Sequence, residues 1–264
     1  MSFQIPLWNS PKEPPHSNQE SFQPYLTAYL IPGNQIRSAV IVVPGGGYHF
    51  RAAHEGENVA LKFNSLGFHA FVLEYRVAPY VFPAAQEDAI RSVRLVRYHA
   101  EEWHIRPERI ALLGFSAGGH LACSTGILFD KIPARNWDET DSVSARPDAL
   151  GLCYPVITAN VPYAHRDSFV KLLGREFSAE EAETLSLENQ VRPDMPPTFL
   201  WHGGEDSFVP CENSLLMTEA LRRCHVPVEL HIFRKGGHGI DLGGERCPYV
   251  QIWPELFREF FNTL

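Results

Sequence analysis

Short apolar runs alternate along this chain with longer segments in which apolar residues recur at helical spacing. The runs are rich in β-branched and aromatic residues, as in Ser-Ala-Val-Ile-Val-Val at 38–43, which is typical of strands buried on both faces of a sheet. Glycine or proline follows several of these runs and marks their ends. The pattern predicts strands at 27–31, 38–43, 69–75, 109–113, 149–154, 197–201 and 228–233.

Helical spacing is found in the segments between these strands. The segment 84–103 carries Ile90, Val93 and Val96 on one helical face. Further helices are expected at 55–66, 212–224 and 248–262. Because strands and helices alternate, we expect an α/β fold with a mostly parallel central sheet and helices on both faces.

Two polar, proline-punctuated segments interrupt this order, at 127–148 and 155–196. The second contains short helical patterns near 167–174 and 178–185, and we expect it to form a small cap over the functional site. Residues 1–25 are rich in Pro, Ser, Asn and Gln and are predicted to form an N-terminal arm. Residues 26–264 are predicted to form a single domain that includes both insertions.

Composition narrows the classes of partner and location. The formal net charge of −8 disfavours nucleic acid and anionic membranes as partners. Hydrophobic residues make up 44% of the chain, enough for a large core, yet no uncharged apolar run is long enough to span a bilayer. The five cysteines include no Cys-x-x-Cys pair and are expected to be reduced thiols. Since the N-terminus also lacks signal-peptide features, we expect a cytoplasmic protein, and no pattern specifies its oligomeric state.

The segment Gly114-Phe115-Ser116-Ala117-Gly118 has the Gly-x-Ser-x-Gly form of a nucleophile elbow. A predicted strand leads into it and a run that can form a helix follows it. In such an elbow the serine occupies a sharp turn, so that its hydroxyl projects from the end of the sheet. We therefore predict that Ser116 is a nucleophile.

A serine nucleophile needs a base, usually a histidine that is oriented by a carboxylate. Asp206 follows the strand at 197–201, and His238 follows the strand at 228–233 between glycines. The order Ser116, Asp206, His238 is that of an α/β-hydrolase triad. Alternatives remain: Asp206 could cap the helix that begins near 211, Glu205 and then Asp241 are rival acids, and His238 could be an ordinary loop histidine.

Acyl transfer also requires hydrogen-bond donors for the oxyanion. The segment Pro44-Gly45-Gly46-Gly47 follows the strand at 38–43, and glycines let backbone N–H groups approach a developing charge. We expect the N–H groups of Gly46 or Gly47 to act together with that of Ala117. A phosphate-binding loop is the alternative, but the Gly-Lys that follows such a loop is absent.

Histidines near these motifs raise the question of a metal site. No His-Glu-x-x-His or paired Cys/His spacing occurs, so neither a metal nor another cofactor is expected. His120 fits a packed residue in the first turn of a helix. Tyr48, His54 and Glu55 are candidates for substrate binding, with ordinary loop packing as the alternative.

The chain combines several motifs: Pro44-Gly45-Gly46-Gly47-Tyr48, His54-Glu55-Gly56-Glu57, Tyr75-Arg76-Val77-Ala78-Pro79, Gly114-Phe115-Ser116-Ala117-Gly118-Gly119-His120-Leu121-Ala122, Tyr154-Pro155-Val156-Ile157 and His238-Gly239. Together they resemble the α/β-hydrolase esterases, in the acetyl-xylan esterase or carbohydrate esterase branch related to hormone-sensitive-lipase-like esterases. The resemblance covers about 38–262. Relatives of the lipase-like type usually carry His before the three glycines, where this chain has Pro44.

The resemblance implies an α/β-hydrolase catalytic domain with Ser116 as nucleophile, His238 as base and Asp206 as its orienting acid. It also implies a small acyl group such as acetate. The leading hypothesis is therefore a serine carboxylesterase that needs no cofactor and deacetylates sugars or xylo-oligosaccharides. The alternatives are a serine peptidase on the same fold, a non-enzymatic binding protein, a feruloyl rather than an acetyl donor, and acyl transfer to an alcohol rather than to water.

Overall fold

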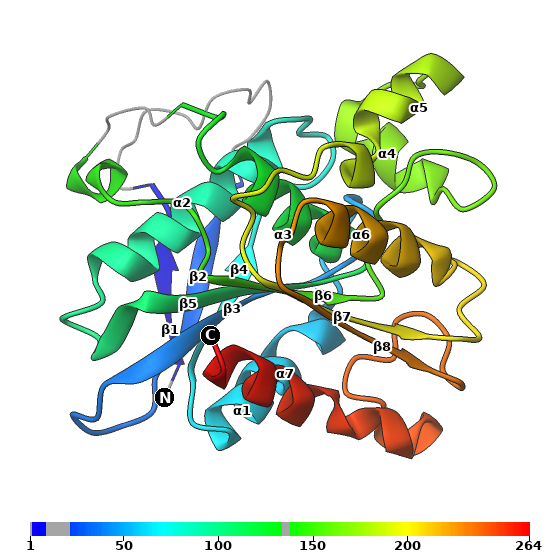
Figure 1. The fold of residues 1–264 in the computed structure, drawn as a ribbon. Helices are drawn as coiled ribbons and strands as arrows, with labels where there is room; N and C mark the ends of the chain where they lie inside the picture. Colours follow the sequence, from blue (N-terminus) through cyan, green and yellow to red (C-terminus); the bar gives the residue numbers. More distant parts are fainter. Residues whose placement is uncertain (1, 9–21, 134–137) are drawn as a thin grey trace.

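The computed structural model describes residues 2–8, 22–133 and 138–264, which form one eight-stranded sheet with helices on both sides (Figure 1). The strand order is β1-β2-β4-β3-β5-β6-β7-β8. The six strands from β3 to β8 run parallel, whereas β2 pairs antiparallel with both β1 and β4. The strands are β1 (Ser2–Pro6), β2 (Tyr25–Tyr29), β3 (Arg37–Val43), β4 (His69–Glu74), β5 (Ile105–Phe115), β6 (Ala149–Cys153), β7 (Thr198–Gly203) and β8 (Val228–Phe233).

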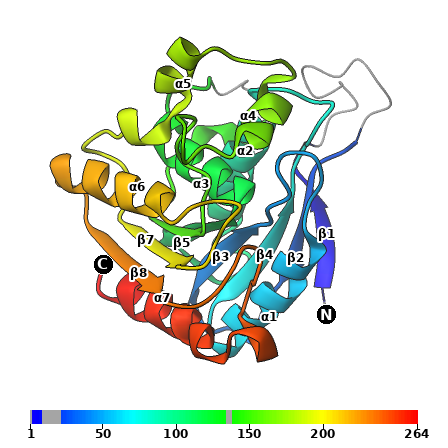
Figure 2. The same cartoon turned by 90° about the vertical axis from the view of Figure 1, so that its right-hand side faces the viewer.

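Helices cover both faces of the sheet, with one group packed on each face (Figures 1 and 2). The first group is α2 (Ala84–Tyr98), α3 (Ala117–Leu128) and α6 (Glu212–Arg223), and the second is α1 (Glu57–Ser65) and α7 (Trp253–Asn262). The predicted α/β fold with a mostly parallel sheet is thus confirmed. None of the helices in the described part of the chain is long and apolar enough to cross a membrane.

Alternate residues of each central strand enter different cores, because successive side chains point to opposite faces of a sheet. In β3, Ile41 joins the core beneath α2, α3 and α6, while Val42 joins the core formed with α1 and α7. Both side chains are fully buried. This burial on two faces explains why the strands appear in the sequence as continuous apolar runs.

The N-terminal region differs from the prediction. Residues 2–6, expected in an arm, form β1, which pairs along its whole length with β2. The segment is short, exposed and ends in Pro6, so its strand pattern is weak in the sequence, and tertiary pairing decides its conformation. The first predicted strand, at 27–31, lies at Tyr25–Tyr29 instead, and the rest of the predicted arm falls largely outside the described residues.

Two helices also differ in extent from the prediction. The helix expected at 84–103 ends at Tyr98, and the one expected at 248–262 begins with a 3₁₀ helix, Pro248–Ile252, before α7.

The insertion at 155–196 contains α4 (Arg166–Leu173) and α5 (Ala179–Leu185), close to the predicted helices. Both lie beyond α3, on the side of the sheet that α2, α3 and α6 cover (Figure 2). The insertion has a small core of its own, in which Phe169, Phe177 and Ala182 pack together with Val209. Val209 belongs to the loop after β7, so this core joins the insertion to that loop.

Candidate active site

Ser116 occupies the turn between β5 and α3, in a backbone conformation that few residues adopt. Its φ is +52° and its ψ is −120°. These angles describe a strained backbone. A strained conformation persists only where the surrounding structure enforces it, and it is found most often at functional sites. The geometry is that of the predicted elbow.

The two glycines of the elbow allow its backbone segments to approach closely. A Cβ atom added at Gly118 would lie 2.2 Å from the carbonyl oxygen of Val43, and one at Gly114 would lie 2.1 Å from that of Gly118. Both of these carbonyl oxygens belong to tightly packed backbone, so displacing either of them would destabilise the fold. The Gly-x-Ser-x-Gly pattern therefore has a steric cause in this fold.

Gly118→Ala is expected to destabilise the fold by at least about 3 kcal/mol, because the added methyl group overlaps the end of β3. Urea unfolding measures the change. Gly237→Ala is the control, since a Cβ atom there would meet nothing within 4 Å. Equal stability of the two variants would contradict this account of the elbow.

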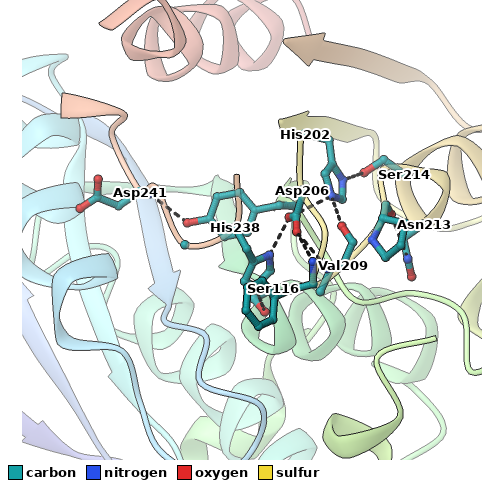
Figure 3. Close-up of polar contacts among 12 residues, drawn as sticks. Ser116, His202, Asp206, Val209, Asn213, Ser214, His238 and Asp241 are labelled. Atoms are coloured by element: carbon teal, nitrogen blue, oxygen red, sulfur yellow. Dashed lines mark hydrogen bonds and ion pairs between the residues drawn. The ribbon is translucent and has the colours of Figure 1, made fainter. Parts of the chain in front are cut away.

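A row of hydrogen bonds joins the three residues predicted as a triad (Figure 3). His238 Nε2 lies 2.7 Å from Ser116 Oγ, and His238 Nδ1 lies 2.7 Å from Asp206 Oδ2. An ionised carboxylate only accepts hydrogen bonds, so the Nδ1–H donates to Asp206 and Nε2 is left to accept from the serine hydroxyl. The three residues follow β5, β7 and β8, at the carboxyl edge of the parallel sheet.

The surroundings of Asp206 stabilise its ionised form. Burial alone would raise its pKa, but hydrogen bonds from His202, His238 and the Val209 N–H hold the pKa well below the usual range. Its second oxygen, Oδ1, accepts from the N–H groups of Phe208 and Val209 at 3.0 and 2.9 Å. Asp206 therefore closes the turn after β7 and also contacts the histidine.

The rival acids lie elsewhere. Glu205 is exposed and pairs with Lys235 at 3.2 Å. The Asp241 carboxylate accepts a hydrogen bond from the N–H of Leu242. Of the three acids considered, Asp206 is the one that contacts the His238 ring.

His202 supports Asp206 from the core, a role that sequence analysis did not assign. It is fully buried, and its Nε2 lies 2.8 Å from the Val209 carbonyl oxygen and 3.5 Å from Asp206 Oδ2. A carbonyl oxygen accepts, so Nε2 carries the proton and Nδ1 accepts from the Ser214 hydroxyl at 2.8 Å (Figure 3). His202 thereby ties the Asp206 turn to α6.

The glycine loop after β3 places backbone donors beside Ser116. Gly46 and Gly47 have φ values of +118° and +62° and line the same cavity as Ser116 and His238. Within the described residues, the N–H of Gly45 is bonded to Glu55 at 2.7 Å, whereas those of Gly46 and Gly47 donate to no protein acceptor. Ala117, the first residue of α3, follows the serine directly. Gly46 and Gly47 are thus available for an oxyanion.

The three residues predicted to bind substrate have different environments. The Tyr48 side chain lies in the core rather than at the cavity wall, and its hydroxyl lies 2.8 Å from Nδ1 of the buried His120. His120 is packed as predicted, and burial lowers its pKa to about 3. His54 does line the cavity, with Nε2 3.2 Å from the Gly239 carbonyl oxygen. Glu55 borders the cavity but is only 2% exposed.

Glu55 connects the two loops that flank Ser116. Its Oε2 accepts from the N–H of Gly45, and its Oε1 accepts from the Tyr154 hydroxyl at 2.7 Å. That hydroxyl in turn accepts from the N–H of Asp241, three residues after His238, and the Tyr154 ring packs 5.1 Å from the His238 ring. Burial raises the Glu55 pKa, against the effect of these hydrogen bonds. Glu55 is therefore a positioning residue.

Glu55→Gln is expected to destabilise the protein by about 1–3 kcal/mol, because both neighbours donate and an amide nitrogen cannot accept from either. We also expect kcat to fall more than KM changes, since the variant disturbs the loops rather than the cavity wall. Urea unfolding and ester hydrolysis test this, with the exposed Glu101→Gln as control. Unchanged stability and kcat would show that the network is dispensable.

The cavity above Ser116 has a volume of about 570 Å³. The glycine loop, the His238 loop and the insertion all contribute to its wall. Six residues of the wall were not singled out in the sequence, because no motif marks them: Phe50, Ala52, His165, Asp167, Lys171 and Phe208. In the described part of the chain, no group of three or more His, Cys, Asp or Glu is arranged to hold a metal ion.

Comparisons with known proteins agree with this geometry. The BD-FAE family model matches residues 28–221. The crystal structure of an acetyl ester-xyloside bifunctional hydrolase from Caldicellulosiruptor lactoaceticus superposes with a TM-score of 0.92 at 46% identity, over 99% of this chain and 96% of that one. The similarity thus extends over nearly the whole of both chains.

Two curated relatives are longer proteins. Endo-1,4-beta-xylanase B of Butyrivibrio fibrisolvens is 39% identical over 85% of this chain, and acetylxylan esterase of Xylanibacter ruminicola is 29% identical over 81%. The chain covers only 36% and 43% of these two proteins. The fold, the elbow and these matches together place the chain in the BD-FAE family of α/β-hydrolase esterases, in the branch that contains acetylxylan esterases.

Proposed function

We propose that this protein is a serine carboxylesterase that removes short acyl groups, with acetylated sugars or xylo-oligosaccharides as its substrates. The main support is the hydrogen-bonded row Ser116–His238–Asp206, which opens into a cavity next to unbonded backbone donors. A hydroxyl, a neutral imidazole and a carboxylate in this order are the groups required for nucleophilic acyl transfer.

In the first half of the reaction, Ser116 Oγ attacks the ester carbonyl carbon while His238 Nε2 takes the serine proton. The oxyanion accepts hydrogen bonds from the N–H groups of Gly46 or Gly47 and of Ala117. The carbon–oxygen bond to the alcohol then breaks, and the alcohol oxygen receives the proton from Nε2. An acyl group remains on Ser116.

In the second half, a water molecule attacks the acyl carbon after giving a proton to His238. The same donors stabilise the second oxyanion, and the bond to Ser116 breaks as the serine regains its proton. One ester and one water yield one acid and one alcohol. Asp206 stays ionised throughout and holds His238 with its Nδ1–H towards the carboxylate.

The names of the relatives support the choice of substrate. One is an acetylxylan esterase and another is an acetyl ester-xyloside hydrolase, so an acetyl group on a xylose-containing sugar is the substrate that we propose here.

Hydrolysis of p-nitrophenyl esters from acetate to dodecanoate tests the proposal, followed by release of acetate from acetylated xylan fragments. Fast turnover of the acetate that falls steeply with acyl length is the expected result. A preference for long acyl chains would contradict the short-acyl assignment, and no turnover of any ester would contradict the function.

A further inference from the structure

Two exposed aromatic side chains line the cavity. Phe50 is 58% exposed and Phe208 is 69% exposed, although most large apolar side chains of the chain are buried. Single exposed apolar residues are common on protein surfaces, but these two border the same cavity as Ser116. Their shared position indicates a binding role.

The sheet order places these rings on either side of the nucleophile. Phe50 follows β3, Ser116 follows β5 and Phe208 follows β7, and β5 lies between β3 and β7 in the sheet. The Phe208 ring centre lies 6.3 Å from that of His238. Because His238 returns its proton to the leaving alcohol in the proposed mechanism, Phe208 lies on the alcohol side of the ester.

The insertion adds two charged residues to the wall. Asp167 and Lys171 are four residues apart on α4, a spacing at which opposite charges often pair. Both line the cavity, yet neither side chain forms a hydrogen bond or an ion pair with any described residue. By contrast, Arg166 on the same helix pairs with Glu176 at 2.8 Å. The cavity wall therefore contains one hydrogen-bond acceptor, Asp167, and one donor, Lys171, whose side chains have no partner among the described residues.

We propose that the wall of this cavity binds the sugar ring that carries the ester, with Phe208 against its apolar face and Asp167 and Lys171 bonded to its hydroxyl groups. The inference rests on the proposed esterase function and names the residues that recognise its sugar. A pyranose ring has an apolar C–H face and a polar edge. It can therefore pack on an aromatic ring and form hydrogen bonds with both charged side chains at once. An alkyl or aryl alcohol would leave the two charges unused.

The test compares kcat/KM for an O-acetylated methyl xyloside with kcat/KM for ethyl acetate, which has the same acyl group and no ring. Phe208→Ala is expected to lower the ratio of the two values about tenfold, through the lost apolar contact. Lys171→Met and Asp167→Asn are each expected to lower it by about tenfold or more, because Met removes the charged donor and Asn removes the charge of the acceptor. Phe3→Ala is the control, since Phe3 is an exposed residue of β1 and does not line the cavity.

This experiment distinguishes failure of the sugar site from failure of the esterase function. A wild-type protein that hydrolyses both esters, together with variants whose ratio equals that of the wild type, would overturn the sugar site and leave the esterase intact. Hydrolysis of ethyl acetate alone by the wild type would also overturn it. Hydrolysis of neither ester would overturn the proposed function itself.

Discussion

Ser116→Ala is expected to lower kcat for p-nitrophenyl acetate by about 10⁵- to 10⁶-fold, because the groups of a triad act as a unit and lose most of their effect together. The Ser116 hydroxyl is the atom aligned with His238, at 2.7 Å, and it lies at the floor of the cavity. The elbow itself remains in the variant, since the glycines on either side are unchanged. The measurement is initial-rate kinetics with the wild type and the variant side by side.

Ser65→Ala is the matched control, because Ser65 is an exposed serine whose hydroxyl bonds to the carbonyl oxygen of Lys62. It should keep wild-type kinetics. A Ser116→Ala protein that is folded and as active as the control would remove Ser116 from the mechanism. The proposal would then need a different nucleophile in the same cavity.

Asp206→Asn is expected to lower kcat by about 10⁴-fold. An amide at this position can present its nitrogen to His238, which favours the ring form with the proton on Nε2 and leaves no base for the serine. Glu205→Gln, one residue earlier in the same turn, is the control and should keep its activity, since Glu205 contacts Lys235 instead. Equal losses in the two variants would contradict the assignment of the acid.

The same substitution should change how stability depends on pH. The Asp206 pKa is lowered in the folded protein from its ordinary value of 3.8. Below that value the unfolded chain binds a proton that the folded protein does not, so the contribution of this carboxylate is present above about pH 4 and is lost as the pH falls further. Urea unfolding at pH 3 to 5 should therefore show a shallower acid decline for Asp206→Asn than for the wild type.

The central fold and the serine–histidine–aspartate row could be predicted because each has a strong local cause. Strands such as β3 and β7 are buried on both faces, so their apolar runs are continuous. The elbow needs glycines at 114 and 118 for steric reasons, and these leave a fixed pattern in the sequence. Asp206 and His238 follow strands that end at one edge of the sheet, so their order in the chain predicts their proximity.

The cavity wall could not be predicted in the same way. Phe208 lies in the loop after β7 and Lys171 lies on α4, and the two line one cavity only because of how the fold arranges these elements. For Tyr48 the sequence left substrate binding and ordinary packing open, and in the structure its ring packs against His120 and Tyr75 in the core. Burial of this kind depends on neighbours that are distant in sequence.

The small core that joins the insertion to the loop after β7 has a consequence for how this protein can be re-engineered. The insertion reaches the rest of the molecule partly through Val209, whose backbone contacts both Asp206 and His202. It also contributes Ile157, Leu172, Leu187 and Met195 to the core beneath α2, α3 and α6. A segment grafted into the insertion to accept a new alcohol must therefore keep these four apolar side chains, so that the core beneath α2, α3 and α6 stays filled. Such a graft must supply an apolar side chain that packs on Val209, since without it the turn that holds the acid loses its support.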